Sequence, residues 1–267
     1  MPAEERTMFT QTRSSRWLVG LAVSSVCFLA SATSAEPLGA REILEKMSAE
    51  ISGLNSFEIS GEIYADRRLD EGLLIEHASE VTMKVRRPDA MRLTIRDLES
   101  VKELFFAEGI ITFYNDLNKY YAQTEAPGDL AATAEFAVHE VGIDAPLLDF
   151  LSNSLAARLE DQAHEVDHLG ESLIRGQRYH HIAIRLPEMD VQIWVASEGR
   201  PLPGKMVLSA KWEGGAPRTV MFFEWDTSPR IPKGTLDFVP PEGASEIEFL
   251  LDQSTGNQVE ESSNETP

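Results

Sequence analysis

Apolar residues recur at every second position along much of this chain, in short runs separated by turn residues. Residues 57–63, 81–85 and 91–95 each alternate an apolar side chain with a polar or charged one. Successive side chains of a β-strand point to opposite faces, so each run predicts a strand with one apolar and one wet face. A chain of such strands must cover its apolar face, because soluble monomers rarely expose more than a few hundred Å² of it.

Short connections indicate that these strands are antiparallel neighbours. Turn chemistry stands at Asp70-Glu71-Gly72, Pro88-Asp89 and Glu108-Gly109, and the last of these predicts a tight hairpin. Connections of this length favour an antiparallel meander. A second group of strands is predicted over residues 178–186, 191–197, 205–212 and 218–226.

Two stretches of helical spacing accompany the strands. The first covers residues 38–52, where Ile43, Leu44, Met47 and Ile51 share one stripe. The second covers residues 129–159, between the two strand groups. The predicted fold class is therefore α+β, mainly β: one strongly curved antiparallel sheet, an incomplete barrel, whose concave apolar face is covered by helices.

The first residues are typical of a secretory signal peptide. Arg13 and Arg16 precede an apolar run over residues 17–30, and small residues lead to a cleavage site after Ala35, with Ala32 as the alternative. The run is about 14 residues long, short of the roughly 20 that span a bilayer as a helix. We therefore expect a periplasmic protein with no stable membrane span.

The predicted organisation is a signal peptide (residues 1–35), one domain (36–251) and a disordered polar tail (252–267). The single cysteine, Cys27, lies inside the signal, so the mature domain has no disulfide. Val26 stands where a lipoprotein signal needs a small residue, which argues against acylation of Cys27. A formal net charge of −20 repels phosphate backbones and anionic lipid surfaces, and we expect no nucleic-acid partner.

Five separated motifs resemble, in the same order, a family of predicted periplasmic proteins catalogued as domain of unknown function 2092. They are Arg86-Arg87-Pro88-Asp89, His180-His181-Ile182-Ala183, Gln192-Ile193-Trp194-Val195, Arg200-Pro201-Leu202-Pro203-Gly204-Lys205 and Phe238-Val239-Pro240-Pro241. The resemblance spans about residues 41–249. Families of this kind are similar to the lipoprotein-carrier fold, in which an unclosed half-barrel is capped by helices and the cavity between them takes acyl chains.

The resemblance implies a non-enzymatic periplasmic binding protein that holds a lipid, an acyl chain or a lipid-modified protein under its helices. On alternation, the residues expected to line such a cavity are Ile59, Met83, Leu93, Phe113, Ile193, Met206, Leu208 and Phe223. The same residues can instead be ordinary core. Arg86, Arg87 and Arg92 can meet a lipid headgroup at the rim or lie on a solvated strand face. A sensor or scaffold that binds another envelope protein is a further alternative.

One motif points to a different class of protein. His164-Glu165-Val166-Asp167-His168 matches H-E-x-x-H, in which two histidines of one helix hold zinc and the glutamate activates water. Glu188 is the available third ligand for such a zinc hydrolase. Gly170 follows His168 too closely for the extended motif, and on a strand His180 and His181 point to opposite faces. The favoured interpretation has no catalytic residue, no metal and no cofactor.

Overall fold

Strands and a few helices make up the computed structural model, which describes residues 39–69, 73–126, 128–139, 145–152, 155–211 and 217–249. The helical segments are α1 (Ala40–Ser52), α2 (Leu130–His139), the 3-10 helix η1 (Pro146–Leu151) and α3 (Leu155–Gln162). The strands are β1 (Ser56–Arg68), β2 (Leu74–Arg86), β3 (Ala90–Arg96), β4 (Val101–Ala107), β5 (Ile110–Asn115), β6 (Tyr120–Glu125), β7 (Glu165–Ile174), β8 (Gln177–Arg185), β9 (Met189–Ala196), β10 (Pro203–Ala210), β11 (Arg218–Asp226) and β12 (Ser245–Ile247).

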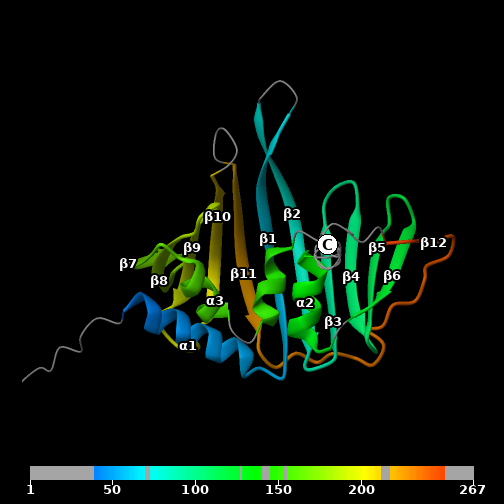
Figure 1. The fold of residues 1–267 in the computed structure, drawn as a ribbon, viewed down its shortest axis with the longest axis horizontal. Coiled ribbons are helices and arrows are strands. Elements are labelled where there is room, and N and C mark those ends of the chain that lie inside the picture. Colours follow the sequence, from blue (N-terminus) through cyan, green and yellow to red (C-terminus); the bar gives the residue numbers. More distant parts are fainter. Residues whose placement is uncertain are drawn as a thin grey trace, which may run out of the picture. The chain divides into compact units, whose positions relative to one another are not determined.

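All of these strands belong to one curved sheet, in the order β12-β6-β5-β4-β3-β2-β1-β11-β10-β9-β8-β7 (Figure 1). Neighbours are antiparallel except β12 and β6, which run parallel. The two end strands do not pair with each other, so the sheet is not closed into a barrel. The predicted fold class is confirmed.

The sheet consists of two meanders, β1–β6 and β7–β11, which meet where β1 pairs with β11. In this pairing Ile59 lies opposite Trp225 and Ile63 opposite Met221. Gly61 is required between them, because a Cβ atom there would clash with the carbonyl oxygen of Phe222. The pairing of β1, the first strand of one meander, with β11, the last strand of the other, joins the two meanders into one continuous sheet.

The hairpin expected at Glu108-Gly109 is confirmed. It joins β4 to β5, and both residues have positive φ, 54° and 78°. Two consecutive positive φ values are those of the type I′ turn, whose twist matches that of the flanking strands.

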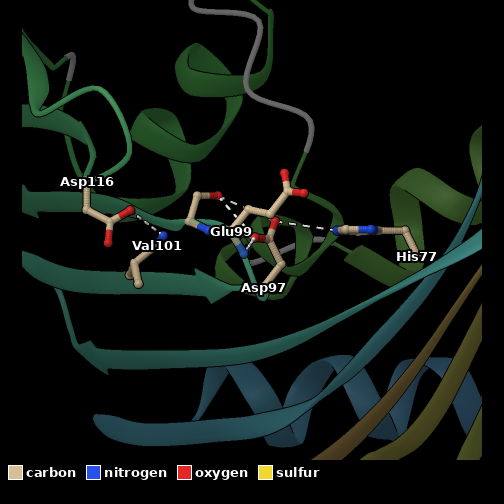
Figure 2. Close-up of polar contacts among 6 residues, drawn as sticks. His77, Asp97, Glu99, Val101 and Asp116 are labelled. Atoms are coloured by element: carbon tan, nitrogen blue, oxygen red, sulfur yellow. Dashed lines mark hydrogen bonds and ion pairs between the residues drawn. The ribbon is translucent and has the colours of Figure 1, made fainter.

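The turn between β3 and β4 is organised by Asp97 (Figure 2). Its Oδ1 accepts hydrogen bonds from the backbone N–H groups of Glu99 (2.9 Å) and Ser100 (2.7 Å), and its Oδ2 lies 3.4 Å from Nε2 of His77 on β2. Burial raises the pKa of the Asp97 carboxyl, but the hydrogen bonds from Glu99, Ser100 and His77 together outweigh it, and the pKa is lowered from its ordinary value.

The helices lie on one face of the sheet, as expected. The predicted stripe of α1 is buried: Ile43, Leu44, Met47 and Ile51 belong to the same core as the inward side chains of the strands. The largest fully buried side chains of this core are Phe57, Phe106, Phe150, Ile43, Leu44, Met47, Ile59, Met83, Met91, Ile111, Leu130 and Leu147.

The second helical stretch is confirmed, but the segment after it differs from the sequence prediction. As predicted, this stretch contains more than one helix: its described residues form α2, η1, which begins at Pro146, and the start of α3. Asp129 caps α2, because its Oδ1 accepts hydrogen bonds from the N–H groups of Ala131 and Ala132, each at 3.1 Å. The alternation did not reveal β7, and β12 also went unpredicted. The predicted signal peptide, including Cys27, and the predicted tail lie outside the described residues.

A C-terminal strap (residues 227–249) crosses the sheet on the face opposite the helices. Phe238 of the strap packs between the rings of Phe105, Tyr114 and Tyr121, at centroid distances of 5.3, 6.0 and 5.2 Å. The strap then forms β12 beside β6 (Figure 1). It therefore covers the backbone groups at one end of the sheet, whereas at the other end no described strand pairs with the outer edge of β7.

Candidate functional site

A cavity of about 370 Å³ separates part of the helix layer from the second meander. Its floor is formed by β9 and β10, its roof by α2, η1 and α3, and one side by the β8–β9 turn. Most of the lining is apolar: Ala131, Ala134, Val138, Ala145, Leu148, Phe150, Leu155, Leu159, Leu186, Met189, Val191, Ile193, Met206 and Leu208. The polar lining residues are Glu135, Asp149, Ser152, Arg158 and Gln162.

Strand alternation and register produce the floor. Met206 pairs with Ile193, and Leu208 pairs with Val191, so four aliphatic side chains from two neighbouring strands form one patch on the inner face. A Cβ atom at the intervening position of each strand points to the opposite face. The period-two pattern is therefore sufficient to build the floor.

Aromatic packing and one arginine hold η1 against the sheet. The ring of Phe150 lies 5.4 Å from that of Phe223 and 5.5 Å from that of Trp225. Nη1 of Arg87 donates to the carbonyl oxygen of Leu151 (3.1 Å), and Nη2 donates to that of Phe150 (3.3 Å). Burial lowers the pKa of Arg87, with Asp129 opposing the shift. Arg87 thus positions η1 rather than facing the cavity.

Three charged side chains tie the roof together at the cavity rim. Arg158 on α3 lies 2.5 Å from Oδ1 of Asp149 on η1 and 3.9 Å from Oε1 of Glu135 on α2. We call these three residues the Arg158 clasp. Each of them is at least partly exposed, so the clasp links the three helical segments through contacts that water can reach.

The structure brings three of the eight predicted site residues into the cavity wall: Ile193, Met206 and Leu208. Phe223 lies next to them under Phe150 but does not line the cavity. The other four belong to the packed core of the first meander, with Ile59, Met83 and Leu93 buried and Phe113 partly buried against the same core. The roof residues were not among the predicted set, although the predicted helical stretch contained Ala134, Val138 and Leu148.

None of the three arginines proposed for a rim lines this cavity. Arg86 lies beside Asp89 in the β2–β3 connection. Arg92 is on the opposite face, where it pairs with Glu103 and lies over the ring of Phe105. Together with Arg87, they stabilise turns, strands and η1.

The interpretation of His164-Glu165-x-x-His168 as a helical zinc site is wrong. Residues 165–174 form strand β7, and a strand does not turn two histidines four residues apart toward one metal as a helix does. Within the described residues no group of three or more His, Cys, Asp or Glu side chains is placed to hold a metal ion. A zinc hydrolase built on this motif is therefore excluded by the local geometry.

His180 and His181 point to opposite faces, as predicted for neighbours on a strand. His181 stacks on Trp194 with ring centroids 4.0 Å apart, and its Nε2 lies 2.9 Å from Oε1 of Gln192. His180 faces the helix side of the sheet, where its ring centroid is 5.1 Å from that of His168. The pairing of β7 with β8 thus brings His168 of the H-E-x-x-H sequence next to His180 of the His180-His181 pair.

Comparison with known proteins identifies a family over almost all of the described chain. The family of predicted periplasmic proteins DUF2092 matches residues 40–250. No curated protein matches the sequence. In the described part of the chain, no helix is both long and apolar enough to cross a membrane.

Several solved structures are similar at low sequence identity. An uncharacterized conserved protein from Thermus thermophilus is 10% identical, with 78% of this chain and 98% of that chain covered and a TM-score of 0.48. The lipoprotein LppX of Mycobacterium tuberculosis is 11% identical, with 72% and 97% covered and a TM-score of 0.42. A LolA superfamily protein from Nitrosomonas europaea is 12% identical, with 74% and 97% covered and a TM-score of 0.35. At these values we transfer no ligand and no partner to this chain.

Proposed function

Because the chain belongs to the DUF2092 family of predicted periplasmic proteins, we propose that it is a non-enzymatic binding protein that holds an acyl chain. The acyl chain would belong to a free lipid or to a lipid-modified protein, and it would lie between the roof helices and strands β9 and β10. The observation that carries the proposal is the aliphatic cavity of about 370 Å³.

The size and the chemistry of the cavity support this ligand class. Small-molecule sites are commonly clefts of about 300–1,000 Å³ lined mainly by apolar side chains. Burial of each methylene contributes about 0.8 kcal/mol, so an alkyl chain gains affinity without any directional contact. The polar lining residues gather in the roof segments, while the floor residues Val191, Ile193, Met206 and Leu208 are apolar. The expected orientation places the methyl end over this floor and the headgroup at the clasp.

The contacts of the roof suggest how a ligand would enter. We expect η1 to stay fixed, because Phe150 is buried between aromatic rings and Arg87 binds its last two carbonyl groups. By contrast, α2 and α3 are joined to η1 by the exposed Arg158 clasp. Breaking ion pairs of this kind costs about 0–1 kcal/mol. Entry would therefore proceed by opening of the clasp about a fixed η1, with movement of α2 and α3 limited by their buried residues Leu130 and Leu155.

Lipid extraction and direct binding test the proposal. Protein purified from periplasm is analysed for bound lipid by mass spectrometry, and the delipidated protein is titrated with a fluorescent C16 acyl probe. We expect Leu208→Trp to weaken probe binding at least about tenfold, which corresponds to roughly 1.4 kcal/mol. Ser209→Trp is the matched control, because the neighbouring side chain of β10 points to the opposite face. Absence of both bound lipid and probe binding would contradict the proposal, as would equal binding by the two variants.

A second candidate function, binding of another envelope protein, is favoured by the exposed end of the sheet. On β7, Leu169 and Leu173 are 57% and 71% exposed. An edge strand with unpaired backbone groups can add an extended segment of a partner. Pull-down with delipidated protein tests this: a partner lost in Leu173→Lys and retained in Leu208→Trp supports it. A partner retained in Leu173→Lys contradicts it.

A further inference from the structure

Two imidazole nitrogens on the helix side of the sheet are buried and without a hydrogen-bond partner. They are Nε2 of His168 on β7 and Nδ1 of His180 on β8. Buried polar atoms in native proteins nearly always have a partner, and an exception calls for an explanation such as a bound ion or water. Here two exceptions belong to two rings that contact each other.

Strand register places the two rings side by side. His168 pairs with Ile182, and Glu171 pairs with His180, with an irregularity between positions 168 and 171. Gly170 lies within this irregularity at a φ of 94°, a conformation that side-chain-bearing residues rarely adopt. The bulge shifts the pairing of β7 with β8 between His168 and Glu171. With this shift the rings of His168 and His180 lie next to each other on neighbouring strands.

The spacing of the rings fits a shared tetrahedral ion. A zinc–nitrogen bond is about 2.0–2.1 Å, which puts the metal about 3.2 Å from the centre of each ligating ring. Two such ligands at the tetrahedral angle have ring centres about 5.2 Å apart. The centroids of His168 and His180 are 5.1 Å apart, and their planes are inclined by 71°. This inclination is compatible with two rings that bind one ion from neighbouring strands.

The charged groups around the two histidines are compatible with a bound cation. Burial lowers the pKa of His180, and His168 lowers it further. The carboxylate of Glu171 acts in the opposite direction. Lys46 of α1 is the positive group near His180, and its Nζ lies 2.8 Å from Oε1 of Glu42. A chain of net charge −20 also attracts cations.

We propose that His168 and His180 form a two-histidine site for a divalent transition metal ion of the Zn²⁺ type. Imidazole suits such ions, and water molecules would complete the tetrahedral coordination. The site has nothing in common with a helical H-E-x-x-H centre except His168. It does not use His164 or Glu165, and it is independent of lipid binding in the cavity.

Zinc titration of the chelator-treated full chain, followed by calorimetry, tests the site. The wild type should bind one Zn²⁺ per chain. His168→Gln and His180→Gln should each weaken binding at least about tenfold, since even changes around a ligand commonly cost 10–100-fold. His181→Gln and His164→Gln are matched controls and should bind as the wild type does. A wild type that does not bind Zn²⁺, or equal loss in His181→Gln, would overturn the proposal.

A spectroscopic readout on the unmodified chain keeps the test decisive if a histidine variant fails to fold. Addition of Zn²⁺ to protein with ¹⁵N-labelled histidine should shift the Nε2 resonance of His168 and the Nδ1 resonance of His180. Co²⁺ should give the intense visible absorption of tetrahedral coordination. Zinc-induced shifts confined to His164 or His181, or no shift at all, would overturn the proposal.

Discussion

The two meanders of the sheet carry similar apolar patterns, but their inner faces have different surroundings. In the first meander, Ile59, Met83 and Leu93 are packed into the core. In the second, Ile193, Met206 and Leu208 line open space of about 370 Å³. The difference lies in the size of the side chains at the two places. The strand residues Phe57 and Phe106 help to fill the core of the first meander, whereas Ala131, Ala134 and Ala145 line the cavity from the roof. Small roof residues over an aliphatic floor leave volume for a ligand.

Two methionines on equivalent faces provide the sharpest test of this comparison. Met83→Ala should cost about 2–5 kcal/mol, because it opens a cavity in a packed core. Met206→Ala should cost less than half as much, because the side chain already borders open space. Urea denaturation of both variants measures the two free energies. Equal losses would show that the cavity is filled in solution.

Two alanines of α2 allow the same comparison from the roof. Ala134→Leu should fill part of the cavity, stabilise the protein by about 0.5–2 kcal/mol and weaken binding of the acyl probe. Ala137 is buried but does not line the cavity, and Ala137→Leu should destabilise by about 1–3 kcal/mol through overpacking. Thermal unfolding and probe titration distinguish the two outcomes. Destabilisation of similar size in both variants would contradict a cavity beneath α2.

The clasp should control ligand entry more than stability. Arg158→Met removes contacts to Asp149 and Glu135, and the unfolding free energy should change by no more than about 1 kcal/mol. Stopped-flow mixing should nevertheless show faster association of the acyl probe. The matched control is Arg185→Met, which removes the pair with Glu165 between β7 and β8, because neither of these two residues lines the cavity. An unchanged association rate in Arg158→Met would mean that the roof opens elsewhere.

The smallest effect is expected at Asp97, in the first meander and distant in the fold from the cavity wall. Its pKa is lowered in the folded protein, so its contribution is fully present above the unfolded value of about 3.9 and is lost as the pH falls through the folded value. Asp97→Asn should therefore destabilise at pH 7, with a difference from wild type that shrinks below about pH 4. Denaturation at several pH values measures this. Probe binding at pH 7 should not change, and a loss of binding would contradict the separation of the two regions.

The alternation of apolar and polar residues predicted well which face of the sheet each side chain occupies. It predicted only part of the cavity lining. Ile193, Met206 and Leu208 were identified, because the pattern states which face a side chain occupies. The same pattern could not separate them from Ile59, Met83 or Leu93, which share that face. The separation depends on residues distant in sequence, such as Ala134 and Leu155, that pack above the floor. Alternation did not predict strand β7, because its apolar residues Val166, Leu169, Leu173 and Ile174 do not recur at every second position.

The sequence by itself determined the class of fold, the inward face of each strand it predicted, the buried stripe of α1 and the Glu108-Gly109 hairpin. These depend on local periodicity and turn geometry, which neighbouring residues specify. Only the tertiary structure decided which part of the inner face encloses a cavity, that η1 is fixed by Arg87, and that His168 meets His180. Each of these depends on the packing of segments that are separated along the chain, where volume and register, rather than local pattern, decide the contact.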